Sequence, residues 1–390
     1  MVYTFADRMK HLGTEASFET LAKAKTLERQ GKNIIHLEIG DPDFETPMNI
    51  KEAAIRAIHE GNTHYVPAEG IYELREAIAQ HISITRRIDV KPEEIVVGPG
   101  CKQLLFLTML ALINPGEEVL YPSPAYPAYE SLINFVGAKP VPIPLMEEYD
   151  FRIDHEYIKE KITRKTKMVI LNSPENPTGG VLTREDLKLI ADCIAEKDNI
   201  IVLSDEIYSQ IVYEKEHESI ASLPGMKEKT IILDGFSKAY AMTGWRLGYA
   251  VMHKEIAQKL TQLVINSHAC TCAFVQVAGI EALNGPQDSV KEMIREFKRR
   301  RELIVSGLNK LKGFSCRKPA GTFYVFPNIK GTGLKSKELA DYLLREADVA
   351  VLPGTAFGVS GEGYLRLSFA NSIENIEKAL EKMAEALEKL

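Results

Sequence analysis

A serine and a lysine stand side by side within residues 231–250, directly after an apolar run that ends in Asp-Gly. Arg246 follows eight residues after Lys238, among small residues. When a lysine is held in a partly desolvated pocket its pKa falls, because burial disfavours the charged ammonium, and the free amine becomes a usable nucleophile. The stretch therefore predicts Schiff-base chemistry at Lys238.

Other apolar runs also end in polar residues capable of chemistry. Asn176 follows one such run, and Asp205 and Tyr208 follow the next. Functional loops of a parallel sheet gather at the carboxyl ends of its strands. If these runs are strands of one sheet, their polar residues should lie close to Lys238.

Short apolar runs alternate with helical segments over most of the chain. This alternation is typical of an α/β fold, with a mostly parallel sheet of the seven-stranded type sandwiched by helices. The expected strands are residues 95–97, 117–124, 138–145, 166–174, 199–206, 230–237 and 248–252.

The pattern changes after Met252. Two expected helices, about residues 255–267 and 274–283, lead to a long charged helix at residues 287–311, and shorter strands follow. We expect a smaller α+β domain with the long helix as its connector. The predicted division is an amino-terminal arm that packs with the small domain (residues 1–46), a large domain (47–285) and the small domain (286–390).

Arg366 lies in a short strand pattern at residues 364–369. Strand alternation places Leu365 and Leu367 on one face and Arg366 on the other. The arginine is either an exposed strand residue or, among buried-looking neighbours, one that binds an anion.

Two glycines are equally open to more than one interpretation. Gly40 follows an extended apolar segment and precedes two prolines, so it is a turn glycine or part of a backbone-shaped loop. Gly100 precedes a long apolar helix, whose first backbone N–H groups suit a phosphate, although many strand-to-helix junctions look alike.

Composition limits the possible functions. A length of 390 residues with 45% hydrophobic content allows two or three structural units with buried cores, and a net charge of -6 gives no overall attraction for nucleic acid. Five cysteines without paired C-x-x-C sets predict neither a disulfide framework nor a metal site. The amino terminus lacks the apolar stretch of a signal peptide, and no run reaches transmembrane length, so we predict a cytoplasmic protein without membrane partners.

Eight segments together resemble a known family: LEIGDPDF, THYVPAEG, GPGCKQ, PAYPAY, NSPENPTGG, LSDEIYS, GFSKAYAMTGWRLGY and YLRLSF. Their order and separations are similar to those of the fold-type I pyridoxal-phosphate enzymes. The resemblance is to the class I/II aminotransferases, in the branch that includes bacterial and archaeal aspartate and aromatic aminotransferases. It covers essentially the whole chain.

The resemblance implies pyridoxal 5'-phosphate as the cofactor, bound by the large domain. Lys238 would form the Schiff base and carry the proton between the substrate α-carbon and the cofactor. Asp205 would sit against the pyridine nitrogen, Tyr208 and Asn176 would donate hydrogen bonds to the phenolate oxygen, and Tyr126 would stack on the ring.

The same resemblance assigns the cofactor phosphate to Ser237, Arg246, the loop Gly100, Cys101 and Lys102, and Tyr65 from a neighbouring subunit. It therefore implies a homodimer. Gly235 stands where many relatives have a second phosphate-binding hydroxyl, which leaves one contact in doubt.

The substrate α-carboxylate would be bound by Arg366, with help from Asn176 and the backbone of Gly40, next to Tyr126. Lys102 is the one clue to the substrate side chain, because a lysine in this loop approaches the distal carboxylate of acidic substrates in some members of the branch. A solvated loop lysine, or one that supports the phosphate, is the plainer alternative.

The implied reaction is a ping-pong transamination through a Schiff base on Lys238 and pyridoxamine phosphate. It moves the α-amino group of an L-amino acid, with aspartate favoured, to a 2-oxo acid such as 2-oxoglutarate. A broad aromatic, alanine or kynurenine-type aminotransferase and a pyridoxal-phosphate lyase on the same fold are the alternatives. A DNA-binding regulator that carries this fold is not expected, since the sequence starts with the aminotransferase-like arm and has no helix-turn-helix extension.

Overall fold

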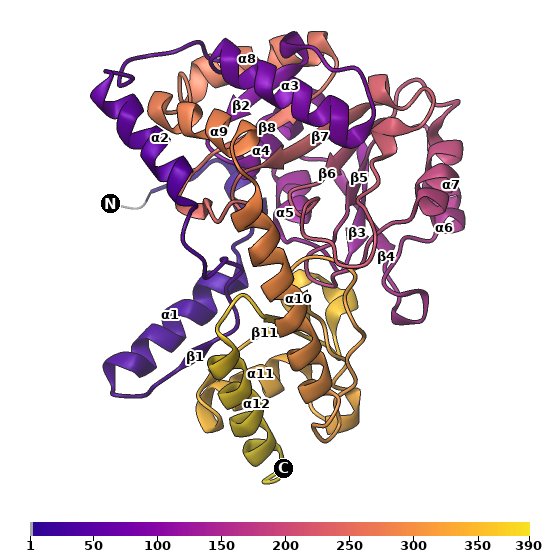
Figure 1. Cartoon of the computed structure of the whole chain (residues 1–390). Helices are drawn as coiled ribbons and strands as arrows, with labels where there is room; N and C mark the ends of the chain where they lie inside the picture. The colour runs from indigo at the N-terminus through magenta and orange to yellow at the C-terminus, as the bar shows by residue number, and fades with distance from the viewer. Residues whose placement is uncertain (1–2) are drawn as a thin grey trace.

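The computed structural model describes residues 3–390. Figure 1 shows an upper part built around a large sheet, which we call the large lobe, and a lower part with the carboxyl-terminal helices, which we call the small lobe. The long helix α10 (Asp288–Leu308) runs from one lobe into the other. The domain boundaries given above stay predictions.

The sheet of the large lobe has the strand order β2, β8, β7, β6, β5, β3, β4. All neighbouring pairs are parallel except the two that involve β8. The predicted α/β fold with a mostly parallel seven-stranded sheet is therefore confirmed. The bounds are β2 Ile95–Gly98, β3 Glu118–Ser123, β4 Lys139–Pro144, β5 Thr166–Asn172, β6 Ile201–Asp205, β7 Thr230–Gly235 and β8 Gly248–Val251.

Side chains alternate across this sheet, so that its two faces bury different apolar clusters. In β5, Met168 and Ile170 belong to one cluster, whereas Val169 and Leu171 belong to another. Because packed layers hold the strands on both faces, the loops at the strand ends start from fixed positions. The helices of this lobe are α2 Met48–His59, α3 Tyr72–Arg86, α4 Cys101–Leu112, α5 Ala128–Phe135, α6 His155–Lys161, α7 Arg184–Ile194, α8 Lys254–Ser267 and α9 Ala273–Asn284.

The small lobe contains a three-stranded antiparallel sheet in the order β11, β12, β9. The expected strand around residues 349–354 is divided, because β10 pairs in parallel with β1 of the amino-terminal arm while β11 pairs with β12. The bounds are α1 Ala16–Arg29, β1 Ile35–His36, β9 Tyr324–Val325, α11 Ser336–Glu346, β10 Val349–Ala350, β11 Leu352–Pro353, β12 Leu365–Ser368 and α12 Ile373–Leu387.

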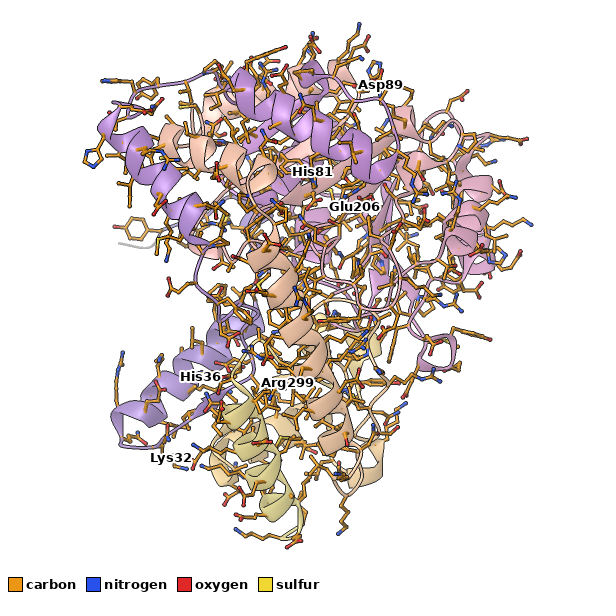
Figure 2. All side chains as sticks on the ribbon, viewed as in Figure 1. Lys32, His36, His81, Asp89, Glu206 and Arg299 are labelled. Carbon is orange, nitrogen blue, oxygen red and sulfur yellow. The ribbon has the colours of Figure 1, made fainter. Side chains whose placement is uncertain are left out.

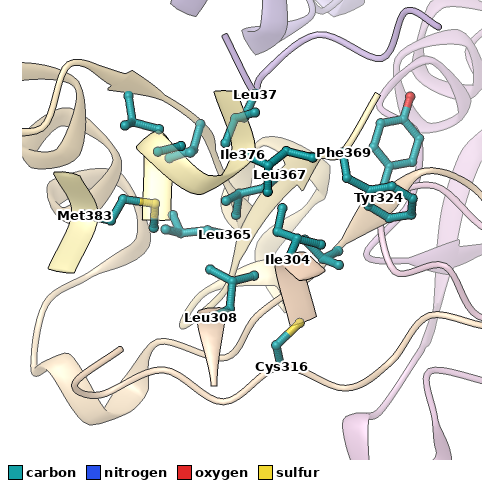
Figure 3. Packing of buried hydrophobic residues seen from close by; sticks show 14 of the residues in the cluster. Leu37, Ile304, Leu308, Cys316, Tyr324, Leu365, Leu367, Phe369, Ile376 and Met383 are labelled. Carbon is teal, nitrogen blue, oxygen red and sulfur yellow. The ribbon is translucent and has the colours of Figure 1, made fainter. Parts of the chain in front are cut away.

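The core of the small lobe collects side chains that are far apart in the sequence. Figure 3 shows Leu37 of the arm, Leu308 of α10, Leu367 of β12 and Met383 of α12 in one cluster. Tyr324 lies at the border of this cluster, with its hydroxyl pointing away from the aliphatic side chains. The same cluster includes Tyr208 from the large lobe, so its packing couples the two lobes next to the predicted site.

The long helix ends three residues earlier than the sequence predicts. It ends at Leu308, and the side chain of Asn309 then exchanges two hydrogen bonds with the backbone of Cys316, at 2.8 and 3.0 Å. The asparagine side chain thereby binds backbone groups outside the helix, and the chain turns after Leu308.

Candidate active site

Neighbouring strands of the large sheet bring several predicted residues to one edge. The register pairs Asn172 at the end of β5 with Asp205 at the end of β6, and Ser237 and Lys238 follow the end of β7. A cavity of about 490 Å³ opens at this edge. Its lining includes every predicted site residue except Gly100 and Tyr65: Gly40, Cys101, Lys102, Tyr126, Asn176, Asp205, Tyr208, Ser237, Lys238, Arg246 and Arg366.

Lys238 lies half-buried in this cavity. Its Nζ donates a hydrogen bond to the carbonyl oxygen of Gly40 at 2.6 Å and lies 5.7 Å from the ring centroid of Phe323. A β-carbon at Gly40 would collide with the hydroxyl of Tyr324. The cavity itself therefore requires glycine at this position, because the backbone of the arm passes so close to the lysine and the tyrosine.

Asp205 is 7% exposed. Burial raises its pKa to about 6, although the hydroxyl of Tyr129 donates a hydrogen bond to its Oδ2 at 2.6 Å and so favours the carboxylate. Within residues 3–390 no cation forms an ion pair with it. An ionised carboxylate that is buried without a counter-charge is costly, so Asp205 is set to meet a positive group that enters the cavity.

Arg366 is 4% exposed, and burial lowers its pKa. Its guanidinium donates to Asn176 Oδ1 at 3.2 Å and to the carbonyl oxygen of Glu38, and it stacks against Tyr324 and Phe357 with its Cζ at 4.3 and 4.9 Å from their ring centroids. Its Nε has no hydrogen-bond partner in the described part of the chain. The strand arginine is thus buried, and no carboxylate of residues 3–390 forms an ion pair with it, which makes its charge costly.

Tyr208 and Asn176 contribute further polar atoms to the cavity. The hydroxyls of Tyr208 and Tyr324 are 3.0 Å apart, and burial raises the pKa of Tyr208 well above its ordinary value. The tyrosine therefore stays neutral and can donate a hydrogen bond. Asn176 is held in place from its backbone, whose N–H donates to Asn172 Oδ1 at 3.0 Å.

One end of the cavity combines several groups that suit an anion. Arg246 follows the 3-10 helix η6 (Thr243–Trp245) with φ 54, a left-handed conformation that is costly for a residue with a side chain and is often found at ligand sites. A β-carbon at Gly100 would collide with its guanidinium. Cys101 begins α4, whose first backbone N–H groups have no partner inside the helix. The hydroxyl of buried Ser237 lines the same cavity.

Lys102, the second residue of α4, and Tyr126 also line the cavity. The Nζ of Lys102 pairs with a carboxylate oxygen of Glu15 and lies 5.6 Å from the ring centroid of Tyr126. The hydroxyl of Tyr126 donates to that same oxygen at 3.0 Å. The ammonium of the half-exposed lysine therefore has a carboxylate from the amino-terminal arm as its partner.

A second charged cluster, which we call the buried network, lies behind the strand ends. Arg86 of α3 donates to Glu206 at 2.7 Å and to Asp234 at 2.6 Å, and His217 Nε2 lies 3.0 Å from Glu206. Figure 2 labels Glu206 within the body of the large lobe. Burial alone would raise the pKa of Glu206, but the charges of His217 and Arg86 lower it to about 2.

Known proteins share both the sequence and the shape of this chain. Residues 32–383 match the sequence pattern of the aminotransferase class I and II family. An aspartate aminotransferase of Pyrococcus abyssi is 45% identical over 360 residues, which cover 91% of this chain and 92% of the relative. An aromatic-amino-acid aminotransferase of Thermococcus litoralis is 43% identical, with coverage of 91% and 92%. A solved structure of alanine aminotransferase from Pyrococcus furiosus has a TM-score of 0.94 at 36% identity, with coverage of 99% and 100%.

The chain belongs to the class I and II aminotransferases. Enzymes of this family use pyridoxal 5'-phosphate, and three observations in this aminotransferase fit that cofactor. A lysine amine is present to bind its aldehyde, and the carboxyl of Asp205 is buried without a cation where a pyridinium would supply one. The Arg246 guanidinium and the start of α4 meet at the end of the cavity that would take a phosphate.

Tyr65 is the one predicted residue that lies apart from the others. It is 89% exposed and does not line the cavity of its own chain. Nearby in sequence, Met48, Ile55 and Tyr72 also expose large apolar side chains. Its predicted role, a contact with the cofactor phosphate of a neighbouring subunit, depends on that second subunit.

Some residues of the cavity carry no recognisable signal in the sequence. Tyr129 lies in α5, three residues after Tyr126, but nothing in the sequence marks its bond to Asp205. Glu15 is one charged residue among many in the arm, and its contact with Lys102 spans 87 positions. Tyr324 and Phe357 look like ordinary core aromatics until the structure places them against Arg366.

Residues 3–390 contain neither a metal-ligand cluster nor a membrane-spanning helix. Between residues 3 and 390 no group of three or more His, Cys, Asp or Glu side chains is arranged to hold a metal ion. Over the same residues no helix is both long and apolar enough to cross a membrane. The cytoplasmic location stays a prediction from the sequence.

Proposed function

We propose that this aminotransferase moves the α-amino group of an L-amino acid, with aspartate favoured, to a 2-oxo acid such as 2-oxoglutarate. The observation that carries the proposal is Arg366, a buried guanidinium without an ion-pair partner among the described residues, in the same cavity as Lys238. Every α-amino acid and 2-oxo acid offers the planar carboxylate that such a group binds with two parallel hydrogen bonds.

The chain's own residues divide the remaining work. Pyridoxal phosphate, when bound, supplies an electron sink for the carbanion formed at the substrate α-carbon. Lys238 is the base that would move the proton between that carbon and the cofactor. Asp205 offers its negative charge to the ring nitrogen, and Tyr208 and Asn176 offer hydrogen bonds to the ring oxygen. Ser237, Arg246 and the backbone from Gly100 to Lys102 bind the phosphate.

The cavity wall from Tyr126 has two roles in this proposal. Its ring would cover one face of the cofactor, and its hydroxyl, which donates a hydrogen bond to Glu15 at 3.0 Å, would border the space for the substrate side chain. The backbone of Gly40, next to Lys238, would contribute to carboxylate binding. The two residues thereby restrict the orientation in which an amino acid fits.

The preference for aspartate depends on Lys102, which lines the cavity and in this proposal meets the distal carboxylate of the substrate. Steady-state kinetics with 2-oxoglutarate should show that Lys102→Ala lowers kcat/KM for aspartate more than for phenylalanine. Unchanged discrimination between these two donors would remove the basis for this preference. A panel of amino donors, followed through the spectral change of the cofactor, measures the full specificity.

One observation favours a broader enzyme as the second candidate. Lys102 is already paired with Glu15, so a distal carboxylate has to displace the glutamate before it gains a cation. Alanine, aromatic or kynurenine-type donors need no such exchange. If several of them react as fast as aspartate in the donor panel, the broad enzyme is the better description.

A lyase on the same fold would use the same lysine, aspartate and phosphate groups. The products separate the two reactions. A transaminase forms a keto acid only in the presence of 2-oxoglutarate, whereas a lyase releases ammonia without it. Formation of pyruvate and ammonia in the absence of an amino acceptor would contradict transamination as the main activity.

We also propose a homodimer in which Tyr65 completes the phosphate site of the partner. Its 89% exposure in the single chain supports this role, since an aromatic side chain so exposed is available to a second subunit. Two variants test it together, because Tyr65→Ala and Lys238→Ala damage different parts of one shared site. A mixture of the two inactive or weak variants should regain activity in mixed dimers, where one site is intact. No recovery, or a fully active monomer in sedimentation, would contradict the shared site.

A further inference from the structure

Glu15 is the residue just before α1, yet its side chain does not serve that helix. It makes no capping hydrogen bond within the described chain, although the residue at this position often satisfies a free backbone N–H of the first turn. Its carboxylate instead lines the cavity and accepts hydrogen bonds from Lys102 and from the hydroxyl of Tyr126. The arm thus places a negative charge in the lining of the candidate active site, beside Lys102 and Tyr126.

We propose that Glu15 is a specificity-determining residue that competes with the distal carboxylate of an acidic substrate for Lys102 and Tyr126. This inference rests on the proposed transaminase function, and it deepens that function by naming what limits the use of dicarboxylic substrates. A substrate carboxylate and the Glu15 carboxylate need the same two donors, and two anions at one cation repel each other. Neutral substrates leave the pair intact.

The exposure of the pair makes such an exchange feasible. The side chain of Lys102 is 49% exposed and that of Glu15 is 23% exposed. Ion pairs at this degree of exposure contribute little to stability, because water screens them and two flexible side chains lose freedom. A dicarboxylate can therefore displace Glu15, at the expense of a weaker apparent affinity than the lysine alone would give.

Substitution of Glu15 by glutamine keeps the shape of the side chain and removes its charge. We expect Glu15→Gln to raise the ratio of kcat/KM for aspartate to kcat/KM for alanine about tenfold. In the Lys102→Ala background the same substitution should change this ratio less than twofold, because the contested cation is absent. A comparison of all four proteins isolates the coupling between the two residues.

A binding measurement checks the inference without any reaction. Calorimetry on the cofactor-loaded protein should show that Glu15→Gln tightens the binding of maleate, a dicarboxylate, about tenfold, and changes the binding of acetate much less. Glu19→Gln is the matched control, since Glu19 is in the first turn of the same helix and accepts a hydrogen bond from Thr14 at 3.1 Å. It removes the same charge but should leave the maleate affinity unchanged.

The outcomes are distinct. Maleate binding that is unchanged or weaker in Glu15→Gln would overturn the inference, because the glutamate would then assist the dicarboxylate or ignore it. An equal gain in Glu19→Gln would also overturn it, since net charge alone would explain the effect. If no donor is transaminated by any of the proteins, the proposed function fails, while the maleate measurement still decides whether Glu15 competes for the cation.

Discussion

The cavity and the buried network adjoin each other at the strand ends of the large lobe, and they differ in whether their buried charges have partners of opposite charge. Asp205 and Glu206 are consecutive residues, but the first lines the cavity and the second belongs to the buried network. Burial raises the pKa of Asp205 to about 6, whereas His217 and Arg86 overcome burial and lower the pKa of Glu206 to about 2. The difference lies in the partners, since both carboxyls are buried.

Two of the buried arginines, Arg86 and Arg366, show the same contrast. The pKa of Arg86 is raised, because the charges of Glu206 and Asp234 outweigh its burial. Burial lowers the pKa of Arg366 despite the charges of Glu38 and Glu15, and in the described chain its hydrogen bonds reach only neutral oxygens. Charges that neutralise one another hold the fold together. Buried charges left without partners are costly, and they are retained where a ligand supplies the opposite charge.

The largest effect should follow from removing the unpaired arginine. We expect Arg366→Met to lower kcat/KM for every amino donor roughly a thousandfold, about 4 kcal/mol, because the substrate carboxylate loses a charge-assisted partner. Its free energy of unfolding should not fall by more than about 1 kcal/mol, since a buried and uncompensated charge is removed. Steady-state kinetics and urea unfolding measure the two quantities. A large loss of stability would show that Arg366 is a structural residue like Arg86.

The same substitution in the buried network should have the opposite result. Arg86→Met leaves Glu206 and Asp234 buried without their cation, and breaking such a pair costs about 3 kcal/mol of unfolding free energy. Substrate selectivity, measured as the ratio of kcat/KM for two donors, should stay as in the unaltered protein, because no atom of Arg86 lines the cavity. A changed ratio without loss of stability would break the contrast between the clusters.

The sequence predicts the motif residues of the cavity far better than it predicts the contacts between distant segments. Lys238, Asp205 and Asn176 follow apolar runs, so the sheet pattern alone brings them to one edge, and the matched motifs supply their roles. The strand alternation around Arg366 is confirmed as well, because Leu365 and Leu367 join the core of the small lobe while the arginine turns to the cavity.

Contacts between distant segments are what the sequence does not reveal. The pair of Glu15 with Lys102 depends on where the arm is placed by the pairing of β1 with β10, and helical or strand periodicity does not encode that position. The buried network is hidden for the same reason, since Arg86 reads as a surface residue near the end of a helix until α3 packs against β7. Such contacts depend on tertiary packing, which local patterns do not specify.

The raised pKa of Asp205 gives a pH dependence that should be absent for Glu206. In the cofactor-free protein Asp205 holds a proton below about pH 6, and that proton has to leave before the carboxylate can face a positively charged ring nitrogen. Cofactor affinity should therefore fall as the pH is lowered through 6, with a contribution of up to about 1.4 kcal/mol per pH unit. Asp205→Asn is the comparison, since it leaves every other titratable group of the site unchanged. Equal slopes in the two proteins between pH 7 and pH 5 would contradict an unpaired Asp205.

Substitution of Tyr129 should have the smallest effect of the four on the protein. It tests how much a single hydrogen bond offsets the burial of the Asp205 carboxylate. Its hydroxyl donates a hydrogen bond of 2.6 Å to the carboxylate, which partly opposes the rise in pKa caused by burial. Tyr129→Phe keeps the ring and removes the donor, so the pKa of Asp205 should rise by about one unit, and the fall in cofactor affinity should begin about one pH unit higher. Titration of cofactor binding by absorbance from pH 5 to pH 8 measures this shift, and Tyr121→Phe, which keeps the same ring chemistry outside the cavity lining, is the control. A midpoint that does not move would mean that one neutral hydrogen bond leaves the charge of Asp205 unaffected, and that only a cation, as in the buried network, changes it.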